Sequence, residues 1–211
     1  MFRRSHLGVV ALAMLLGWLG VLSAAEEPVK LFNGRDLSGW RIHPENAAGA
    51  FRVEEGMIVV SGKPAGYIYT DRSFRNYVLT FDWRYARPSN LTDDEQFNGN
   101  SGVLLHITGE HKVWPKSVEI QGMNRNHGQV LSVSGAPVSD TKFDAEARKR
   151  AVKRVGEWNT TEITVRNGEI TTKVNGVPVS SCKTTLTEGP IGFQSEGAEI
   201  HFRNIMLREL K

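Results

Sequence analysis

The stretch S-V-E-I-Q (residues 117–121) places a carboxylate and a carboxamide at alternate positions of the chain. Successive side chains of a β-strand point to opposite faces, so Val118 and Ile120 would share one face and the polar residues the other. A carboxylate such as Glu119 can act as a general base, and an amide such as Gln121 can orient a substrate by hydrogen bonding. The pattern therefore predicts either a binding or reacting face, or a strand face that is simply in contact with water.

Other side chains of the kinds that bind sugars occur on or near predicted strands. Saccharide sites combine flat aromatic rings with amides and carboxylates that hydrogen-bond adjacent hydroxyl groups. Beyond Glu119 and Gln121, such side chains occur at Trp83, Tyr85, Trp114, Gln194 and Glu196. The aromatic face from Tyr77 to Tyr85 is more often core than binding platform, so we expect Trp83 and Tyr85 to pack inside the protein.

The strand that carries Glu119 lacks a second acid. The common route of glycoside hydrolysis requires two carboxylates that flank the scissile bond. Sandwich glycosidases often supply them from one strand as E-x-D-x-x-E, whereas residues 119–124 read E-I-Q-G-M-N. This strand therefore does not support the two-acid mechanism.

Several other kinds of chemistry find no support in the sequence. The histidines at 43, 106, 111, 127 and 201 do not have the spacing of a zinc motif, and the acidic run at 93–95 lacks the spaced ligands of a calcium loop. A glycine-rich phosphate loop and a G-x-S-x-G nucleophile motif are both absent from the sequence. We predict no cofactor and no metal ligands, and the sequence leaves open whether a divalent ion assists.

Short alternating runs separated by turn residues predict an antiparallel sandwich or barrel. The clearest hairpin joins residues 161–166 and 169–174 through Asn167-Gly168, a pair suited to a type I′ turn. Asn175-Gly176 begins the next reversal. The other predicted strands are 51–54, 57–60, 77–85, 102–108, 113–122, 189–194 and 198–210.

Two segments depart from this pattern. Residues 86–100 are polar and rich in turn formers, which predicts a loop, and such a loop could line a site. Residues 142–155 consist largely of strong helix formers and predict one short helical insertion. We interpret their basic residues as a solvated face and not as a nucleic-acid site, because no aromatic stacking platform accompanies them.

The first residues resemble a secretory signal peptide. Arg3 and Arg4 precede an apolar run, and Ser23-Ala24-Ala25 offers a cleavage site, so we predict a signal peptide at 1–25 and a single domain at 26–211. An uncleaved membrane anchor is the alternative. Loss of the signal leaves 24 basic against 23 acidic residues, and the only cysteine, Cys182, excludes an internal disulfide. These features predict export to a bacterial periplasm or to the cell exterior.

Six segments together resemble one known family. They are L-F-N-G-R-D-L-S-G-W (31–40), N-S-G-V-L-L-H (100–106), W-P-K-S-V-E-I-Q (114–121), G-E-W-N (156–159), K-V-N-G-V-P-V (173–179) and G-P-I-G-F-Q-S-E-G-A-E-I-H-F-R-N-I (189–205). In this order they resemble the 3-keto-disaccharide hydrolase domain family, also described as 3-keto-glycoside lyases and hydratases. The resemblance implies an all-β, concanavalin A-like jelly roll of two curved antiparallel sheets, and it implies breakdown of saccharides already oxidised at C3.

A ketone at C3 acidifies the proton on C2, so one base can start an elimination that releases the group on C1. On this basis we expect Glu119 to act as the base and His106 as a second acid/base. Residues expected to bind the substrate or stabilise its enolate are Gln121, Lys116, Trp114, Asn100, Gln194, Glu196 and Arg203. Arg203 could equally pair with a carboxylate at a strand end. Many family members carry aspartate-histidine-glycine after the last glutamine, where this chain has Ser195-Glu196-Gly197, so Glu196 would replace that histidine or the activity has changed.

Two other functions remain open at this stage. The same fold hosts lectins, so a non-catalytic carbohydrate-binding module is the main alternative, and a structural domain that docks a partner is the other. We expect a saccharide as the partner, and neither nucleic acid nor a membrane once the signal is removed. The sequence does not fix the glycoside, the anomer or the oligomeric state.

Overall fold

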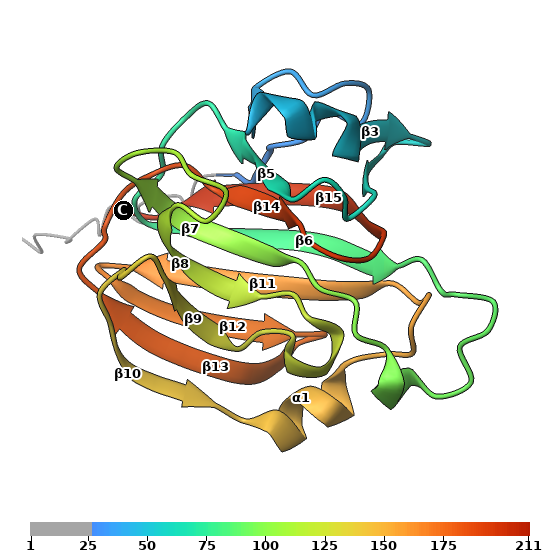
Figure 1. The fold of residues 1–211 in the computed structure, drawn as a ribbon. Coiled ribbons are helices and arrows are strands. Elements are labelled where there is room, and N and C mark those ends of the chain that lie inside the picture. Colours follow the sequence, from blue (N-terminus) through green and yellow to red (C-terminus); the bar gives the residue numbers. More distant parts are fainter. Residues whose placement is uncertain (1–26) are drawn as a thin grey trace, which may run out of the picture.

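The computed structural model describes residues 27–211, which form two antiparallel sheets packed face to face (Figure 1). The large sheet has nine strands in the order β10–β13–β12–β11–β6–β15–β4–β3, with β1 paired to β15, and the small sheet has six in the order β2–β5–β14–β7–β8–β9. The predicted sandwich is therefore confirmed. The predicted signal peptide lies outside the described residues.

The strands of the large sheet are β1 (Val29–Lys30), β3 (Phe51–Glu54), β4 (Met57–Val60), β6 (Tyr77–Tyr85), β10 (Val138–Phe143), β11 (Asn159–Arg166), β12 (Glu169–Val174), β13 (Val177–Thr184) and β15 (Ile200–Glu209). Those of the small sheet are β2 (Trp40–His43), β5 (Gly66–Thr70), β7 (Gly102–Thr108), β8 (Lys116–Gln121), β9 (Val130–Val133) and β14 (Gly192–Ser195). The helical segments are the 3₁₀ turns η1 (Glu45–Ala50), η2 (Asp94–Gln96) and η3 (Asn124–Asn126), and the α-helix α1 (Ala145–Ala151).

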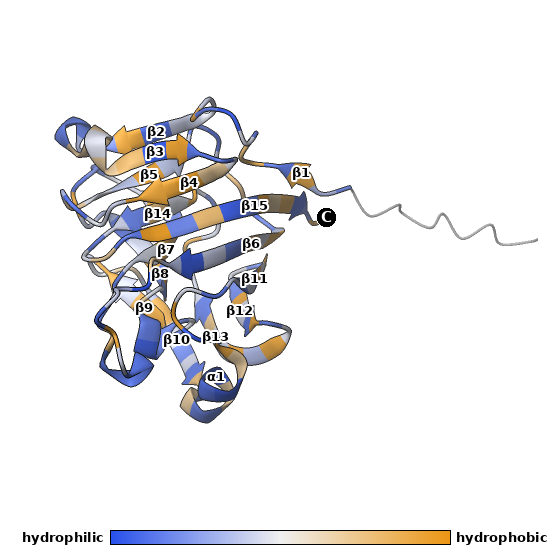
Figure 2. Ribbon diagram, turned by 90° about the vertical axis from the view of Figure 1, so that its right-hand side faces the viewer, coloured by the Kyte–Doolittle hydropathy of each residue, from blue (hydrophilic) through white to orange (hydrophobic). Residues whose placement is uncertain are grey.

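The core lies between the two sheets and follows the alternation of the sequence. Every second residue of β6 is buried, including Trp83 and Tyr85, which confirms that this aromatic face is core. Phe193 of β14 packs edge-on against Phe81 of β6, with ring centroids 5.2 Å apart, and so joins the sheets. Figure 2 shows hydrophobic and hydrophilic residues following one another along β15, as a strand with one buried face requires.

The predicted hairpin is confirmed in its turn and in its register. Asn167 and Gly168 have φ of 51° and 80°, the two positive angles of a type I′ turn, and Arg166 pairs with Glu169. The second Asn-Gly, at Asn175 and Gly176, has the same signs and joins β12 to β13.

The predicted helix at 142–155 is wrong in its limits. Lys142 and Phe143 instead pair with β13, as the end of β10. Asp144 then caps the helix by accepting a hydrogen bond from the Ala147 amide at 2.8 Å, and Val152 is already extended. Edge pairing and an N-cap thus override the helix propensity of the flanking residues.

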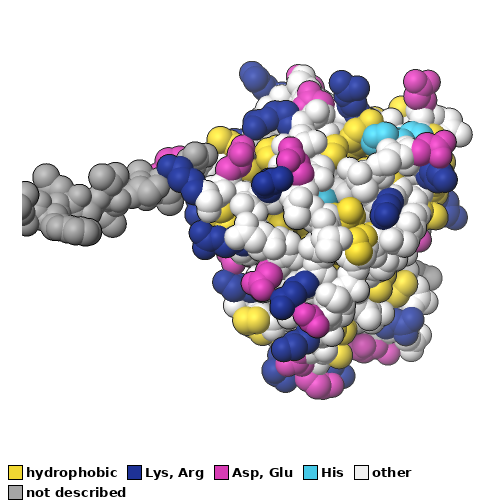
Figure 3. Space-filling model, turned by 90° about the vertical axis from the view of Figure 1, so that its left-hand side faces the viewer, with side chains coloured by type: hydrophobic (Ala, Val, Ile, Leu, Met, Phe, Trp, Pro, Cys, Tyr) yellow, Lys and Arg dark blue, Asp and Glu magenta, His cyan; other side chains and the backbone are white. Residues whose placement is uncertain are grey.

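Charged side chains of both signs occur together on the face seen in Figure 3. In Figure 3, basic and acidic side chains are mixed over the visible face without a large area of one sign. Among residues 27–211 there is no helix that is both long and apolar enough to span a bilayer.

His127 ties the loop after β8 to the large sheet. Its ring stacks on Trp83 at 3.9 Å between centroids, and its Nε2 lies 2.8 Å from the Thr161 hydroxyl, which accepts a hydrogen bond from the Trp83 indole. The hydroxyl of Tyr85 donates to the Gly122 carbonyl at 2.8 Å. These contacts fix the loop that follows β8 against the large sheet, and they thereby hold the C-terminal end of β8 in place.

Burial lowers the pKa of His127 to about 3, from the usual value near 6.5. The unfolded chain therefore binds more protons in this range, and stability should be lost as pH falls from about 6.5 towards 3. We expect the free energy of unfolding by urea to depend less on pH in His127→Gln than in the wild type. Comparing the two proteins cancels Glu119, whose raised pKa acts in the opposite direction, and identical pH profiles would show that His127 is not the source.

Candidate active site on the small sheet

Glu119 lies on β8 with its side chain on the outer face of the small sheet. Val118 and Ile120 are buried between the sheets, as the alternation predicts. Leu104 of β7 lies directly opposite Glu119, and Gly102 lies opposite Gln121, so these residues share the outer face. Glu119 is only 6% exposed, so its carboxylate is not freely solvated.

Gly102 leaves the space that this carboxylate occupies. A Cβ atom at Gly102 would lie within 3.0 Å of Oε1 of Glu119 and of Oε1 of Gln194. The two side chains reach over Gly102 from the strands on either side of it, β8 and β14. The Gln194 amide lies close enough to the Glu119 carboxylate to lower its pKa.

A second carboxylate lies nearby, and it comes from β14 instead of β8. Glu196 follows directly after β14, two residues beyond Gln194 and therefore on the same face. Burial and then the charge of Glu196 raise the pKa of Glu119 to about 7, against the lowering effect of Gln194. Burial also raises the pKa of Glu196 itself. The pair thus provides a buried carboxylate that is a stronger base than an exposed glutamate.

Two amide side chains, those of Asn100 and Gln194, lie beside the two carboxylates. Asn100 precedes β7 and forms a backbone bridge to Glu196, and its side chain acts to lower the pKa of Glu196, against the effect of burial. Within residues 27–211, neither Oδ1 of Asn100 nor Oε1 of Gln194 has a hydrogen-bond partner, although both atoms are buried. Buried polar atoms are rarely left unsatisfied in folded proteins.

The same outer face continues across β14 to aromatic residues that the sequence analysis did not select. Tyr67 of β5 pairs with Gln194, and Tyr69 pairs with Gly192. The hydroxyl of Tyr67 lies 2.6 Å from Nδ1 of His111, which belongs to the loop between β7 and β8. The Y-I-Y alternation at 67–69 was the available signal, but the position of β5 next to β14 is a long-range pairing that no local pattern contains.

The structure does not bring His106 to Glu119. A bulge between Leu105 and Thr108, with φ of 54° at His106, shifts the alternation by one residue, so Ile107 and not His106 joins Leu104 on the outer face. His106 is fully buried, its Nδ1 lies 2.7 Å from the Leu186 carbonyl, and its ring meets Tyr77 of the large sheet edge-on.

Arg203 also lies elsewhere, on the outer face of the large sheet. Its neighbour Phe202 enters the core, so Arg203 points away from it, on the opposite side of the sandwich from Glu119. Its Nε lies 3.4 Å from Oδ2 of Asp82, and its guanidinium lies over the Trp158 ring at 3.9 Å. The ion-pair role is therefore the one its surroundings support.

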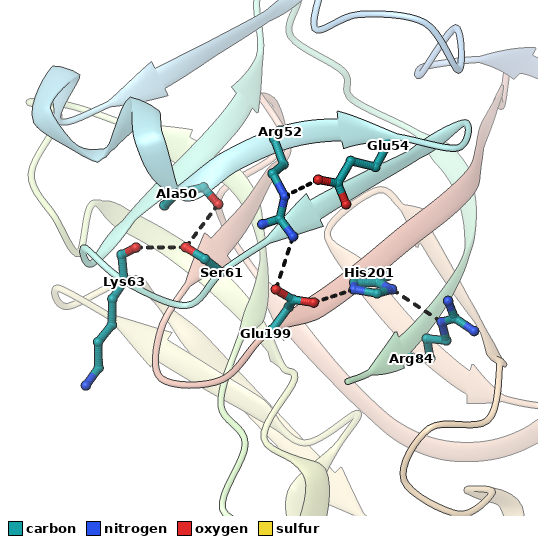
Figure 4. A network of polar contacts seen from close by, with 8 residues as sticks. All are labelled: Ala50, Arg52, Glu54, Ser61, Lys63, Arg84, Glu199 and His201. Atoms are coloured by element: carbon teal, nitrogen blue, oxygen red, sulfur yellow. Dashed lines mark hydrogen bonds and ion pairs between the residues drawn. The ribbon is translucent and has the colours of Figure 1, made fainter. Parts of the chain in front are cut away.

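Figure 4 shows a network of charged side chains on this same face of the large sheet. Glu199 accepts from Arg52 and from His201, and Arg84 completes the chain. Because the side chains of Arg52 and Glu199 are each more than a third exposed, the ion pair between them adds little to stability.

The remaining expected residues have the following places. Lys116 is exposed at the start of β8, and Trp114 is half-buried just before it, with a carbonyl that accepts from the Ser134 hydroxyl at 2.7 Å. Gln121 shares the Glu119 face, and its Oε1 accepts from the Met123 amide at 2.7 Å. The Nε2 group of Gln121 is then the part that can donate to a ligand.

The larger hollows in the described surface lie away from Glu119. Two of about 470 and 600 Å³ lie along β10, β12 and β13, at the far end of the large sheet. Their shared lining includes Glu169 and Lys183, which face each other across β12 and β13 as an ordinary cross-strand pair. Among residues 27–211, no cluster of three or more His, Cys, Asp or Glu side chains could hold a metal ion.

Comparison with known proteins identifies a family and similar folds. A profile of the family described as 3-keto-alpha-glucoside-1,2-lyase-like domains matches residues 27–208. A 3-keto-disaccharide hydrolase of Bacteroides thetaiotaomicron is 21% identical over 242 residues, which cover 88% of this chain and 79% of that protein. The structure of a candidate glycosyl hydrolase from Parabacteroides distasonis superposes with a TM-score of 0.63 at 22% identity, over 87% of this chain and 94% of the other. A Bacillus subtilis protein with a galectin-like fold gives 0.61 at 12% identity, over 88% and 96% of the two chains. At these identities the superpositions establish the fold, and they confirm the predicted jelly roll.

Proposed function

The chain belongs to the family of 3-keto-alpha-glucoside-1,2-lyase-like domains, and on this premise we propose that it is an enzyme that cleaves the glycosidic bond of 3-keto-glycosides. The observation that carries the proposal is the buried Glu119 carboxylate, which leans over Gly102 beside Gln194 and Glu196. A carboxylate with a pKa raised to about 7 is suited to act as a general base near neutral pH.

The reaction needs one base, which first accepts the C2 proton and then donates it to the leaving oxygen. The Glu119 carboxylate takes the proton from C2, next to the C3 ketone, and the electron pair of that C–H bond forms the enolate. The enolate then re-forms the ketone as the C1–O bond breaks, and the carboxyl of Glu119 gives its proton to the departing oxygen. The products are an unsaturated keto sugar and an alcohol, and Glu119 is again a carboxylate.

Hydration reverses the proton transfers. Glu119 takes a proton from water as the oxygen of that water adds to C1, and the proton is then delivered to C2. The sum of both stages is hydrolysis, with the 3-keto monosaccharide as the product. Release of the unsaturated sugar before water adds would make the same protein a lyase.

The neighbours of Glu119 would have distinct roles. The oxygens of Asn100 and Gln194, which are buried and unsatisfied in the free protein, would turn towards the ligand and accept from sugar hydroxyls. Nε2 of Gln121 would donate to the ketone oxygen as charge develops there. Glu196 would act through its charge, which keeps Glu119 a strong base. His106 has no role in this scheme, because it is buried against Tyr77.

Incubation with 3-keto-trehalose or 3-keto-sucrose tests the proposal directly. We expect mass spectrometry to show 3-keto-glucose or its dehydrated glucal, and a parallel reaction with a chelator would show whether a divalent ion assists. Intact substrates together with saturable binding of unoxidised glycans would instead identify a carbohydrate-binding module.

The pH dependence of the reaction should report the Glu119–Glu196 pair. We expect kcat/KM to rise with pH through an apparent pKa of about 7, because the base must be ionised. In Glu196→Gln the rise should move to lower pH, since one of the two causes that raise the pKa is removed. The measurement is kcat/KM across the acid and neutral range for both proteins. An unchanged midpoint in the variant would show that Glu196 does not set the base strength.

A further inference from the structure

An aromatic cluster adjoins the Glu119 site on the same face of the small sheet. It consists of Tyr67 and Tyr69 of β5, His43 of β2 and His111 of the loop after β7, and we call it the aromatic wall. His111 packs on Tyr69 at 4.6 Å between ring centroids and stacks on Tyr67 at 6.1 Å. His43 lies 5.6 Å from the rings of both Tyr67 and His111.

We propose that this wall is the subsite for the leaving sugar of the substrate, with the 3-keto ring held over Gly102. The inference rests on the proposed function and adds the direction in which the substrate lies. C1 and C2 of the 3-keto ring would face Glu119, and the group released from C1 would extend across β14 towards β5.

The register of the small sheet supports this direction. Gln194, which touches Glu119, is paired with Tyr67, and Gly192 is paired with Tyr69. From β8 to β5 there are three interstrand spacings, about 14 Å in all, a length comparable to that of two linked sugar rings. Gly192 pairs with both Leu104 and Tyr69, and the space above its Cα is taken by Ile107 and Tyr67, so the ligand would lie over these side chains.

The members of the wall differ in what they can contact. Tyr67 is fully buried, packs with Leu104 and Ile107, and holds His111 through its hydroxyl, so its part is to position that ring. Tyr69, His111 and His43 are only partly buried. They offer aromatic faces to the apolar C–H side of a sugar and polar atoms to its hydroxyls.

An alternative explanation is that the cluster only fastens the loop between β7 and β8. The Tyr67–His111 hydrogen bond would suffice for that. Tyr69 takes no part in this hydrogen bond, but its ring packs on His111 at 4.6 Å, so a comparison of substrates with and without a leaving sugar is needed to separate a binding role from a fastening role.

The test compares two substrates that differ only in the leaving group, a 3-keto disaccharide and methyl 3-keto-glucoside. Tyr69→Ala is expected to raise KM for the disaccharide about three- to tenfold and to leave kcat/KM for the methyl glycoside unchanged. Trp158→Ala, which removes a half-buried aromatic ring from the opposite sheet, should alter neither. Equal losses on both substrates, or no loss on either, would overturn the wall as a leaving-group subsite.

A binding measurement keeps the test independent of turnover. In a Glu119→Gln background, titration calorimetry with the 3-keto disaccharide should show a Kd weakened about three- to tenfold by Tyr69→Ala and unaffected by Trp158→Ala. An unchanged Kd in Tyr69→Ala would show that the aromatic wall does not bind the leaving sugar, whether or not the wild type cleaves the substrate. Failure of the proposed function would appear separately, as wild-type protein that binds the disaccharide and never converts it.

Discussion

Glu119→Gln is expected to lower kcat on a 3-keto glycoside by between about a hundredfold and ten-thousandfold, the range that a positioned general base contributes. The amide keeps the size of the side chain, so it can still reach over Gly102, but it cannot accept the C2 proton. Single-turnover mass spectrometry with excess enzyme would measure the loss without interference from product release.

The same substitution should not harm the fold. Burial and Glu196 already disfavour the charged form of Glu119, as the raised pKa shows, so a neutral amide removes an unfavourable buried charge. We therefore expect unchanged or higher stability above pH 7. Glu162→Gln is a matched control, because Glu162 is a strand glutamate paired with Lys173 on the large sheet, at 2.9 Å. Near-normal turnover by Glu119→Gln would remove Glu119 from the mechanism.

Local patterns in the sequence were sufficient for much of the sandwich. The alternation in β6 predicted a buried aromatic row, and Asn167-Gly168 predicted a turn that the positive φ angles confirm. The S-V-E-I-Q pattern placed Glu119 and Gln121 on one face. These features depend on neighbours one or two residues apart, so the sequence contains them directly.

The partners of Glu119 depend on which strands lie side by side. The sequence lacks a second acid on β8, and Glu196 comes to Glu119 only because β14, β7 and β8 are adjacent in the small sheet. For the same reason Tyr67 and His111 could not be connected to this site from local patterns. His106 was misplaced by one bulged residue, which reverses the face of every position after it.

The arrangement of the site depends on the missing side chain of Gly102. Gly102 carries no side chain, and Glu119 and Gln194 occupy that space from either side. The backbone of Gly102 does not have the positive φ angle that demands glycine, so the requirement for glycine here comes from the space above it and not from its own conformation.

Gly102→Ala is accordingly expected to lower kcat about ten- to a hundredfold, because displacement of a catalytic group by about 1 Å can cost this much. The added methyl group would lie within 3.0 Å of Oε1 of both Glu119 and Gln194, and these flexible side-chain ends can move aside while the backbone stays in place. Thermal unfolding should therefore change little while turnover falls, and kcat measured beside the melting temperature would separate the two.

Gly49→Ala provides the control for the substitution itself. Gly49 lies in η1, has nothing within 4 Å of the position that a Cβ would take and has no positive φ, so both activity and stability should be retained. Equal activity of Gly102→Ala and Gly49→Ala would show that turnover does not require the Glu119 carboxylate to lie above Gly102. The base would then have to act from another rotamer, and the contact between Gln194 and Glu119 would be a feature of the free protein alone. A loss of kcat confined to Gly102→Ala would instead tie turnover to the position of the carboxylate, since neither its chemical identity nor the backbone around it has changed.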